Sequence, residues 1–116
     1  MATTGLPTVV SDAYELLKWL VDHVGKFPRS HRFVLGERIE TAMLDLVLLL
    51  VEAAYQREAK ARLIHQANVE LEKVRLLIRL GKDLGFTSLR QYEHACVQVT
   101  GIGRQIGGWA RFEASS

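Results

Sequence analysis

Apolar side chains recur every three or four residues along most of the chain, which is the spacing of one face of an α-helix. The first segment of this kind repeats at Ala13, Leu17, Leu20 and Val24. Ser11 or Asp12 can cap its first turn, so the pattern predicts a helix that ends near His23. Pro28 separates this helix from the next, because a proline disfavours the α conformation in the residue before it.

A second helix is predicted from Ser30, which is a suitable N-cap, to about Arg57. Its repeating apolar positions are Ile39, Met43, Leu46, Leu50 and Ala53. No glycine or proline marks its end, so we place the turn into the third helix between Tyr55 and Lys60.

The third helix has apolar positions in heptad register at Ile64, Ala67, Leu71, Val74, Ile78 and Gly81. Gly85 suits the position just after this helix, where a left-handed residue ends the last turn. Ser88 and Gln91 form a capping-box pattern that predicts the start of a fourth helix. The apolar positions predicted for the fourth helix are Leu89, Tyr92, Cys96, Val99, Gly103 and Ile106.

Four amphipathic helices with short connections predict an all-α, up-and-down four-helix bundle. We expect the bundle to span residues 11–112, with flexible tails at 1–10 and 113–116. Of the 116 residues, 48% are hydrophobic and two are proline, which is typical of one helical domain. The longest apolar run, Leu46 to Val51, is far too short to cross a membrane. Because no signal-peptide pattern is present and Cys96 is the single cysteine, expected to be buried, the predicted location is the cytoplasm.

The two middle helices carry apolar side chains on a second side as well. In "VELEKVRLLIRLGK", residues 69–82, Val69, Leu76 and Leu80 fall within about 40° of one another, opposite the predicted core. The second helix repeats this feature at Leu44, Leu48, Val51 and Tyr55. A chain of this length has no second core to cover them, so they predict an interface between copies of the chain. The alternative is that they are ordinary exposed apolar side chains.

Basic residues are concentrated in two blocks, although the net charge is only +2. Residues 26–38 hold four basic and one acidic side chain, and residues 57–82 hold seven and three. Arg75, Arg79 and Lys82 share one side of the third helix, where the two alternatives are phosphate binding and a solvated face paired with acidic neighbours. Further candidates for nucleic-acid binding come from the same blocks: Lys26, Arg29, Arg32, Arg57, Lys60 and Arg62.

Several aromatic residues and glycines suggest close contacts. Trp19 lies away from the apolar positions of its helix, which is typical of a contact surface for a partner. Trp109 and Phe112 are expected to pack in the core at the end of the fourth helix. The same helix holds four glycines, which predict the close approach of a neighbouring helix or, as the alternative, of a bound partner: Gly101, Gly103, Gly107 and Gly108.

The sequence contains no constellation typical of an enzyme. There is no Glu-x-x-His pair, no His-Glu-x-x-His motif and no Cys-x-x-Cys motif, so neither a metal nor another cofactor is expected. The scattered histidines are expected at the surface or at helix ends: His23, His31, His65 and His94. The Arg-x₄₋₆-His spacing of some helical ribonucleases is also missing, and no catalytic residue is predicted.

Three stretches of the sequence resemble one known family. They are "KFPRSHRFVLGERIETAMLDLVLLLVEA" (26–53), "LEKVRLLIRLGKDLGFTSLRQYEHA" (71–95) and "IGRQIGGW" (102–109). Together they closely resemble the accessory variability determinant of diversity-generating retroelements. That family is related to the four-helix-bundle proteins encoded in intervening sequences of large-subunit ribosomal RNA genes, and the apolar "TAMLDLVLLLVEA" favours the retroelement branch.

The resemblance implies a homopentameric barrel of four-helix bundles with a basic outer surface. It also implies a non-enzymatic accessory protein that binds the reverse transcriptase of the element and nucleic acid, either template RNA or an RNA–DNA hybrid. In that role the protein supports mutagenic synthesis of complementary DNA for retrohoming. An alternative hypothesis is an oligomeric protein-binding scaffold that does not bind nucleic acid. A third, a small helical ribonuclease or toxin, lacks its expected residues in this sequence.

Overall fold

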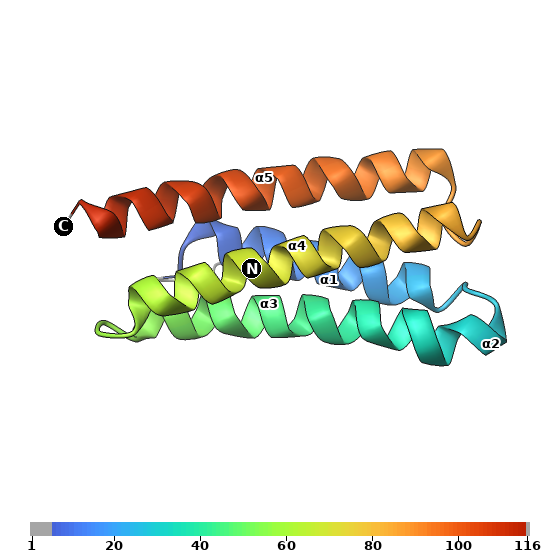
Figure 1. The fold of residues 1–116 in the computed structure, drawn as a ribbon, viewed down its shortest axis with the longest axis horizontal. Coiled ribbons are helices and arrows are strands. Elements are labelled where there is room, and N and C mark those ends of the chain that lie inside the picture. The colour runs from blue at the N-terminus through green and yellow to red at the C-terminus, as the bar shows by residue number, and fades with distance from the viewer. Residues whose placement is uncertain (1–5, 116) are drawn as a thin grey trace.

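Four long helices run alternately up and down, each beside two neighbours (Figure 1). The computed structural model describes residues 6–115. The long helices are α1 (Thr8–Val24), α3 (Glu37–Tyr55), α4 (Lys60–Asp83) and α5 (Leu89–Ala114). The predicted all-α four-helix bundle is therefore confirmed, and the described residues contain no strand.

One apolar core runs along the bundle, which measures 46 × 23 × 22 Å. Helices α1 and α4 each pack against both α3 and α5, and α1 packs less extensively on α5 than on α3. Every apolar position predicted for the second and third helices is buried in α3 and α4. Each buried leucine contributes roughly 1.5–3 kcal/mol to stability, so these two helices hold the centre of the core. Among the described residues, no helix is both long and apolar enough to cross a membrane.

The connections after α3 and α4 agree with the prediction. Helix α3 ends at Tyr55 and α4 begins at Lys60, inside the predicted turn. Gly85 adopts a φ of 86°, and the Phe86 N–H donates a 2.9 Å hydrogen bond back to the Gly81 carbonyl.

The capping box that begins α5 is complete. The Gln91 N–H donates to the Ser88 hydroxyl at 3.1 Å, and the Ser88 N–H donates to the Gln91 side chain at 2.9 Å. The predicted start of the fourth helix is confirmed, because the hydrogen bonds that define it are local and depend on these two residue types.

The start of α1 differs from the prediction. The helix begins at Thr8 behind Pro7, so Ser11 and Asp12 lie inside it and do not cap it. Val9 and Val10 of the predicted tail are buried in the core. Residues 1–5 of that tail lie outside the described residues. Of the apolar positions predicted for this helix, Ala13, Leu20 and Val24 are buried, whereas Leu17 is only partly buried and the neighbouring Leu16 is buried instead.

The segment that leads into α3 also differs from the prediction in detail. The short helix α2 (Arg29–His31) begins directly behind Pro28, so Ser30 is not its N-cap. A π-helical turn, η1 (Arg32–Gly36), then continues into α3. Gly36 is buried, and a Cβ atom added there would lie 2.5 Å from Cγ1 of Val24 in α1. The close approach of α1 therefore explains why the turn needs a glycine.

The register and the length of α5 needed correction. Its buried apolar positions are Ala95, Val99, Ile102 and Ile106, whereas Leu89 is 63% exposed and Cys96 is only partly buried. The helix continues to Ala114, beyond the predicted end at residue 112, and Ser116 lies outside the described residues. Phe112 is 68% exposed and does not pack in the core, although Trp109 does so partly.

The glycines of α5 have different surroundings. A Cβ atom on Gly103 would lie 3.3 Å from Leu71 of α4, which confirms the close approach of a neighbouring helix at this position. Gly101 has open space around it, and the nearest atoms to Gly107 and Gly108 belong to Arg111 of the same helix. The expectation of a close neighbour was therefore wrong at these three positions.

A chain of six aromatic and histidine rings closes one end of the bundle. Neighbouring rings lie 4.5–5.6 Å apart between centroids, in the order His94, Trp19, His23, Phe27, Phe86 and His31. The Nε2 atom of His23 lies 2.8 Å from the Thr87 hydroxyl, and both residues are buried. His23 was expected at the surface or at a helix end; it lies in the last turn of α1, but it is buried and not at the surface.

We predict opposite effects for alanine at two glycines. Gly36→Ala should lower the free energy of unfolding by about 1–3 kcal/mol, because the new methyl group collides with buried Val24. Gly101→Ala should raise it by up to about 1 kcal/mol, since the site is open and alanine favours the helix. Urea unfolding followed by circular dichroism measures both values, and equal effects of the two substitutions would contradict the packing described for Gly36.

Acid should destabilise the fold through His23. Burial lowers the pKa of His23, and the nearby Lys26 lowers it further while Asp22 opposes the shift. The unfolded chain therefore takes up this proton more readily than the folded one, so stability falls as the pH drops below the ordinary histidine value of about 6.5.

Thermal melts at pH 7.5 and pH 5.5 should show this loss in the wild type and a smaller loss in His23→Gln. His65→Gln, a change at an exposed position on α4, should keep the acid sensitivity of the wild type. If His23→Gln is as acid-sensitive as the wild type, the buried histidine is not responsible.

Candidate assembly and nucleic-acid surfaces

Two rows of apolar side chains lie on the outside of α3 and α4, opposite the core. The α3 row is Leu44, Leu48, Val51 and Tyr55, and the α4 row is Val69, Leu76 and Leu80. Six of these side chains are exposed, from 43% for Val69 to 73% for Tyr55, and Val51 is partly buried. The helical spacing places the rows as expected, and their coverage by a second copy stays a prediction.

A groove of about 380 Å³ lies between α3 and α4. Its lining includes Arg38, Asp45 and the ion pair of Lys73 with Glu70, in which Nζ and Oε1 are 3.6 Å apart. Leu76 of the α4 row also lines it. Any surface that covers this groove has to offer partners to these charges as well as cover the leucine, because an unpaired buried charge is costly.

The predicted basic side of α4 is real but carries paired charges. Nε of Arg75 lies 3.3 Å from Glu72, and Arg79 and Lys82 share Asp83 at 3.8 and 3.5 Å. Three cations therefore face two carboxylates, which leaves one unit of positive charge. Exposed pairs of this kind are worth at most about 1 kcal/mol each, so phosphates can replace the carboxylates at small cost.

Lys82 also contacts an aromatic ring of α5. Its Nζ atom lies 4.9 Å from the centroid of the Tyr92 ring. A side-chain hydrogen bond with Cys96 raises the pKa of the Tyr92 phenol. The contact with the Tyr92 ring holds Lys82 against α5, so Lys82 is less free to move than Arg75 and Arg79.

Lys60 has a structural position in the fold. Its ammonium group donates hydrogen bonds to the carbonyls of Ala53 and Ala54, at 2.6 and 3.3 Å, and lies 5.4 Å from the Trp109 ring. The side chain therefore satisfies carbonyls in the last turn of α3. Its predicted part in nucleic-acid binding is untested.

The other candidate cations differ in how far they are engaged. Lys26 lies 3.2 Å from Asp22, and Arg32 donates a long hydrogen bond of 3.4 Å to the Phe27 carbonyl. Among the candidate cations, Arg29, Arg57 and Arg62 are exposed and make no ion pair within residues 6–115. Of the candidates, these three are the most accessible to phosphates.

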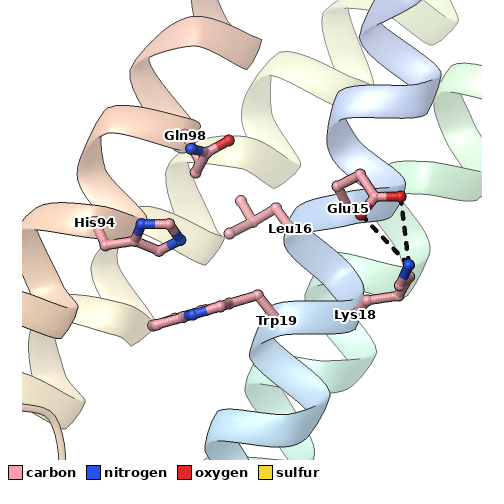
Figure 2. A pocket seen from close by; sticks show the side chains of 6 residues that line it. All are labelled: Glu15, Leu16, Lys18, Trp19, His94 and Gln98. Atoms are coloured by element: carbon pink, nitrogen blue, oxygen red, sulfur yellow. Dashed lines mark hydrogen bonds and ion pairs between the residues drawn. The ribbon is translucent and has the colours of Figure 1, made fainter.

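Trp19 faces α5 across a cleft of about 420 Å³ (Figure 2). Its ring stacks on His23 at 4.9 Å and lies 4.9 Å from His94 of α5. In Figure 2, Gln98 of α5 and Leu16 of α1 line the same opening. Trp19 is thus half-buried within the chain itself, and its predicted contact with a partner is untested.

The residue pattern did not single out Phe33 and Val34, which the π turn presents to solvent. Their side chains are 64% and 67% exposed, whereas the adjacent Leu35 is buried. The available signal was the apolar run in "RFVLG", because consecutive residues of a helix cannot all face one core.

No arrangement typical of a metal centre is found in the part of the chain that the structure describes. There, no three His, Cys, Asp or Glu side chains are grouped so that they could hold a metal ion. The candidate surfaces of this bundle are apolar rows and exposed cations, which are suited to binding other macromolecules.

The fold defines the class of the protein, an all-helical four-helix bundle. The model of the bAvd-like family matches residues 8–113, and the chain belongs to that family. This match confirms the resemblance to the accessory variability determinants. A comparison with curated proteins found no match.

Proposed function

We propose that this protein is a non-enzymatic accessory protein of a diversity-generating retroelement. The observation that carries the proposal is the family match, which covers residues 8–113 and so nearly the whole bundle. In this function the protein binds template RNA or an RNA–DNA hybrid together with the reverse transcriptase of the element. It thereby supports mutagenic synthesis of complementary DNA and retrohoming, and it works in the cytoplasm.

The exposed cations support the nucleic-acid part of the proposal. Arg75 and Arg79 lie on one side of α4 and pair with exposed carboxylates. Phosphates can therefore compete readily with these carboxylates for the two arginines. Such contacts read the phosphate backbone and not the bases, so binding is largely independent of sequence. With a net charge of +2, a single copy offers few contacts.

The apolar rows support assembly of several copies. Six exposed apolar side chains on two adjacent helices make a surface that self-association would cover. The family resemblance suggests a pentamer, in which each basic side is repeated around an axis. Affinity for nucleic acid rises with the number of phosphates engaged, so assembly strengthens binding.

A second candidate is an oligomeric scaffold that binds proteins and not nucleic acid. The carboxylates Glu72 and Asp83 favour it, because they already neutralise much of the charge on α4. In that case Arg75 and its neighbours would dock an acidic protein surface. Binding of labelled RNA at physiological salt separates the two candidates.

We predict that the double substitution Arg75→Ala and Arg79→Ala weakens nucleic-acid binding. The slope of log affinity against log salt concentration should flatten by about two, roughly one for each phosphate that the variant no longer engages. Fluorescence anisotropy of a labelled RNA across a salt series measures both changes. Lys18→Ala removes an exposed, ion-paired cation from α1 and should have no effect. Unchanged affinity and slope in the double variant would count against this site.

A second pair of substitutions, placed in the apolar rows, should lower the mass of the assembly. Leu48→Glu with Leu76→Glu should reduce the number of copies, because it places charge in surfaces that assembly would bury. The helices should persist, since both side chains are more than half exposed in a single chain. Light scattering gives the mass and circular dichroism the helix content.

Val97→Glu is the matched control for this pair. Val97 is 68% exposed on α5, outside both rows, so its substitution should leave the mass unchanged. Equal masses for the wild type and the double variant would exclude the rows as the interface.

A further inference from the structure

Helix α2 lies at one end of the bundle (Figure 1), and η1, which carries Phe33, follows it directly. The Phe33 side chain is 64% exposed. Within residues 6–115 the nearby rings of Phe27, His31 and Phe86 all pair with other rings, whereas Phe33 is in no such pair. Most of its side chain is therefore accessible to a partner.

The turn that carries Phe33 is held firmly by the core. Leu35 and Gly36 end the same turn and are buried, and Gly36 packs against Val24 so closely that no Cβ atom fits. The exposed ring therefore stands on a fixed backbone and not on a loose loop. Little conformational entropy is therefore lost when a ligand binds to this ring, which favours affinity.

Basic residues are concentrated in the segment that carries this ring. Residues 26–38 carry four basic side chains against one acidic, Glu37. Arg29 lies about one helical turn before Phe33, on the same side, and is exposed without an ion pair among the described residues. Arg32 precedes Phe33 directly and makes a single long hydrogen bond to the Phe27 carbonyl. An exposed ring and arginines without ion pairs on one segment form a combination that can bind single-stranded nucleic acid, with the ring under a base and the cations at phosphates.

We propose that Phe33 is a stacking platform for an unpaired base, with Arg29 and Arg32 at the flanking phosphates. The inference rests on the proposed nucleic-acid binding and makes it more specific, because it assigns a preference for single strands. A duplex hides the faces of its bases, so the ring has nothing to stack on there. The alternative is that a protein surface covers the Phe33 side chain, and the experiment has to exclude it.

The test measures binding of a labelled 15-nucleotide RNA, single-stranded or as a blunt duplex, by fluorescence anisotropy. Phe33→Ala should weaken single-strand binding roughly 5- to 150-fold, the range for one stacked base, and should leave duplex binding unchanged. The salt dependence should stay as in the wild type, because no cation is removed. Arg29→Ala should instead flatten the salt dependence.

Conservative variants separate stacking from simple apolar contact. Phe33→Trp should keep wild-type affinity for the single strand, whereas Phe33→Leu, which is apolar but has no ring, should be almost as weak as alanine. Tyr14→Ala is the matched control, since Tyr14 is a 50% exposed aromatic side chain on α1, which carries more acidic than basic residues. It should bind like the wild type.

Several results would overturn the inference. One is wild-type affinity of Phe33→Leu for the single strand. Another is a loss of duplex affinity in Phe33→Ala equal to the loss of single-strand affinity. The third is a change of oligomer mass in the Phe33 variants, which would show that protein covers this ring. If the wild type binds RNA and all Phe33 variants bind equally well, the stacking fails while the proposed function stands. If the wild type binds neither RNA, the proposed nucleic-acid binding fails and the stacking fails with it.

Discussion

Helices α3 and α4 each carry two apolar sides, and one chain supplies only enough structure to cover one of them. The inner sides close the bundle, with Leu46 and Leu71 fully buried. The outer sides leave Leu48 and Leu76 at 55% and 66% exposed. Since burial of a leucine is worth roughly 1.5–3 kcal/mol, the outer rows favour any arrangement that covers them. Self-association of an accessory protein is the arrangement that we propose.

Assembly would also increase the number of basic side chains that one nucleic acid can contact. On α4, the cations Arg75, Arg79 and Lys82 face only two carboxylates, so one copy has a modest surplus of positive charge there. Other arginines, such as Arg29 and Arg57, are exposed and make no ion pair within residues 6–115. Repetition of these sites around an axis would multiply the phosphates that one nucleic acid contacts, which is how a protein with a net charge of +2 can bind RNA. The proposed oligomer and the proposed binding are therefore linked.

The sequence predicted what local chemistry controls and missed what distant contacts control. The core positions of α4, the stop at Gly85 and the outer apolar rows all follow from helical spacing and capping, and all lie where predicted. The π turn and exposed Phe33 depend on Gly36 meeting α1. Burial of His23 depends on Thr87, which is 64 residues away. No pattern within one helix reports such contacts, and this is why these features of the candidate site were not predicted.

The most direct test of the central claim is the mass of the wild-type protein in dilute buffer, measured by analytical ultracentrifugation over a range of concentrations. Coverage of the outer rows on α3 and α4 requires a stable assembly, and a pentamer would have five times the chain mass of 13.1 kDa. A single species at 13.1 kDa at every concentration would contradict the claim that these rows are an interface between copies.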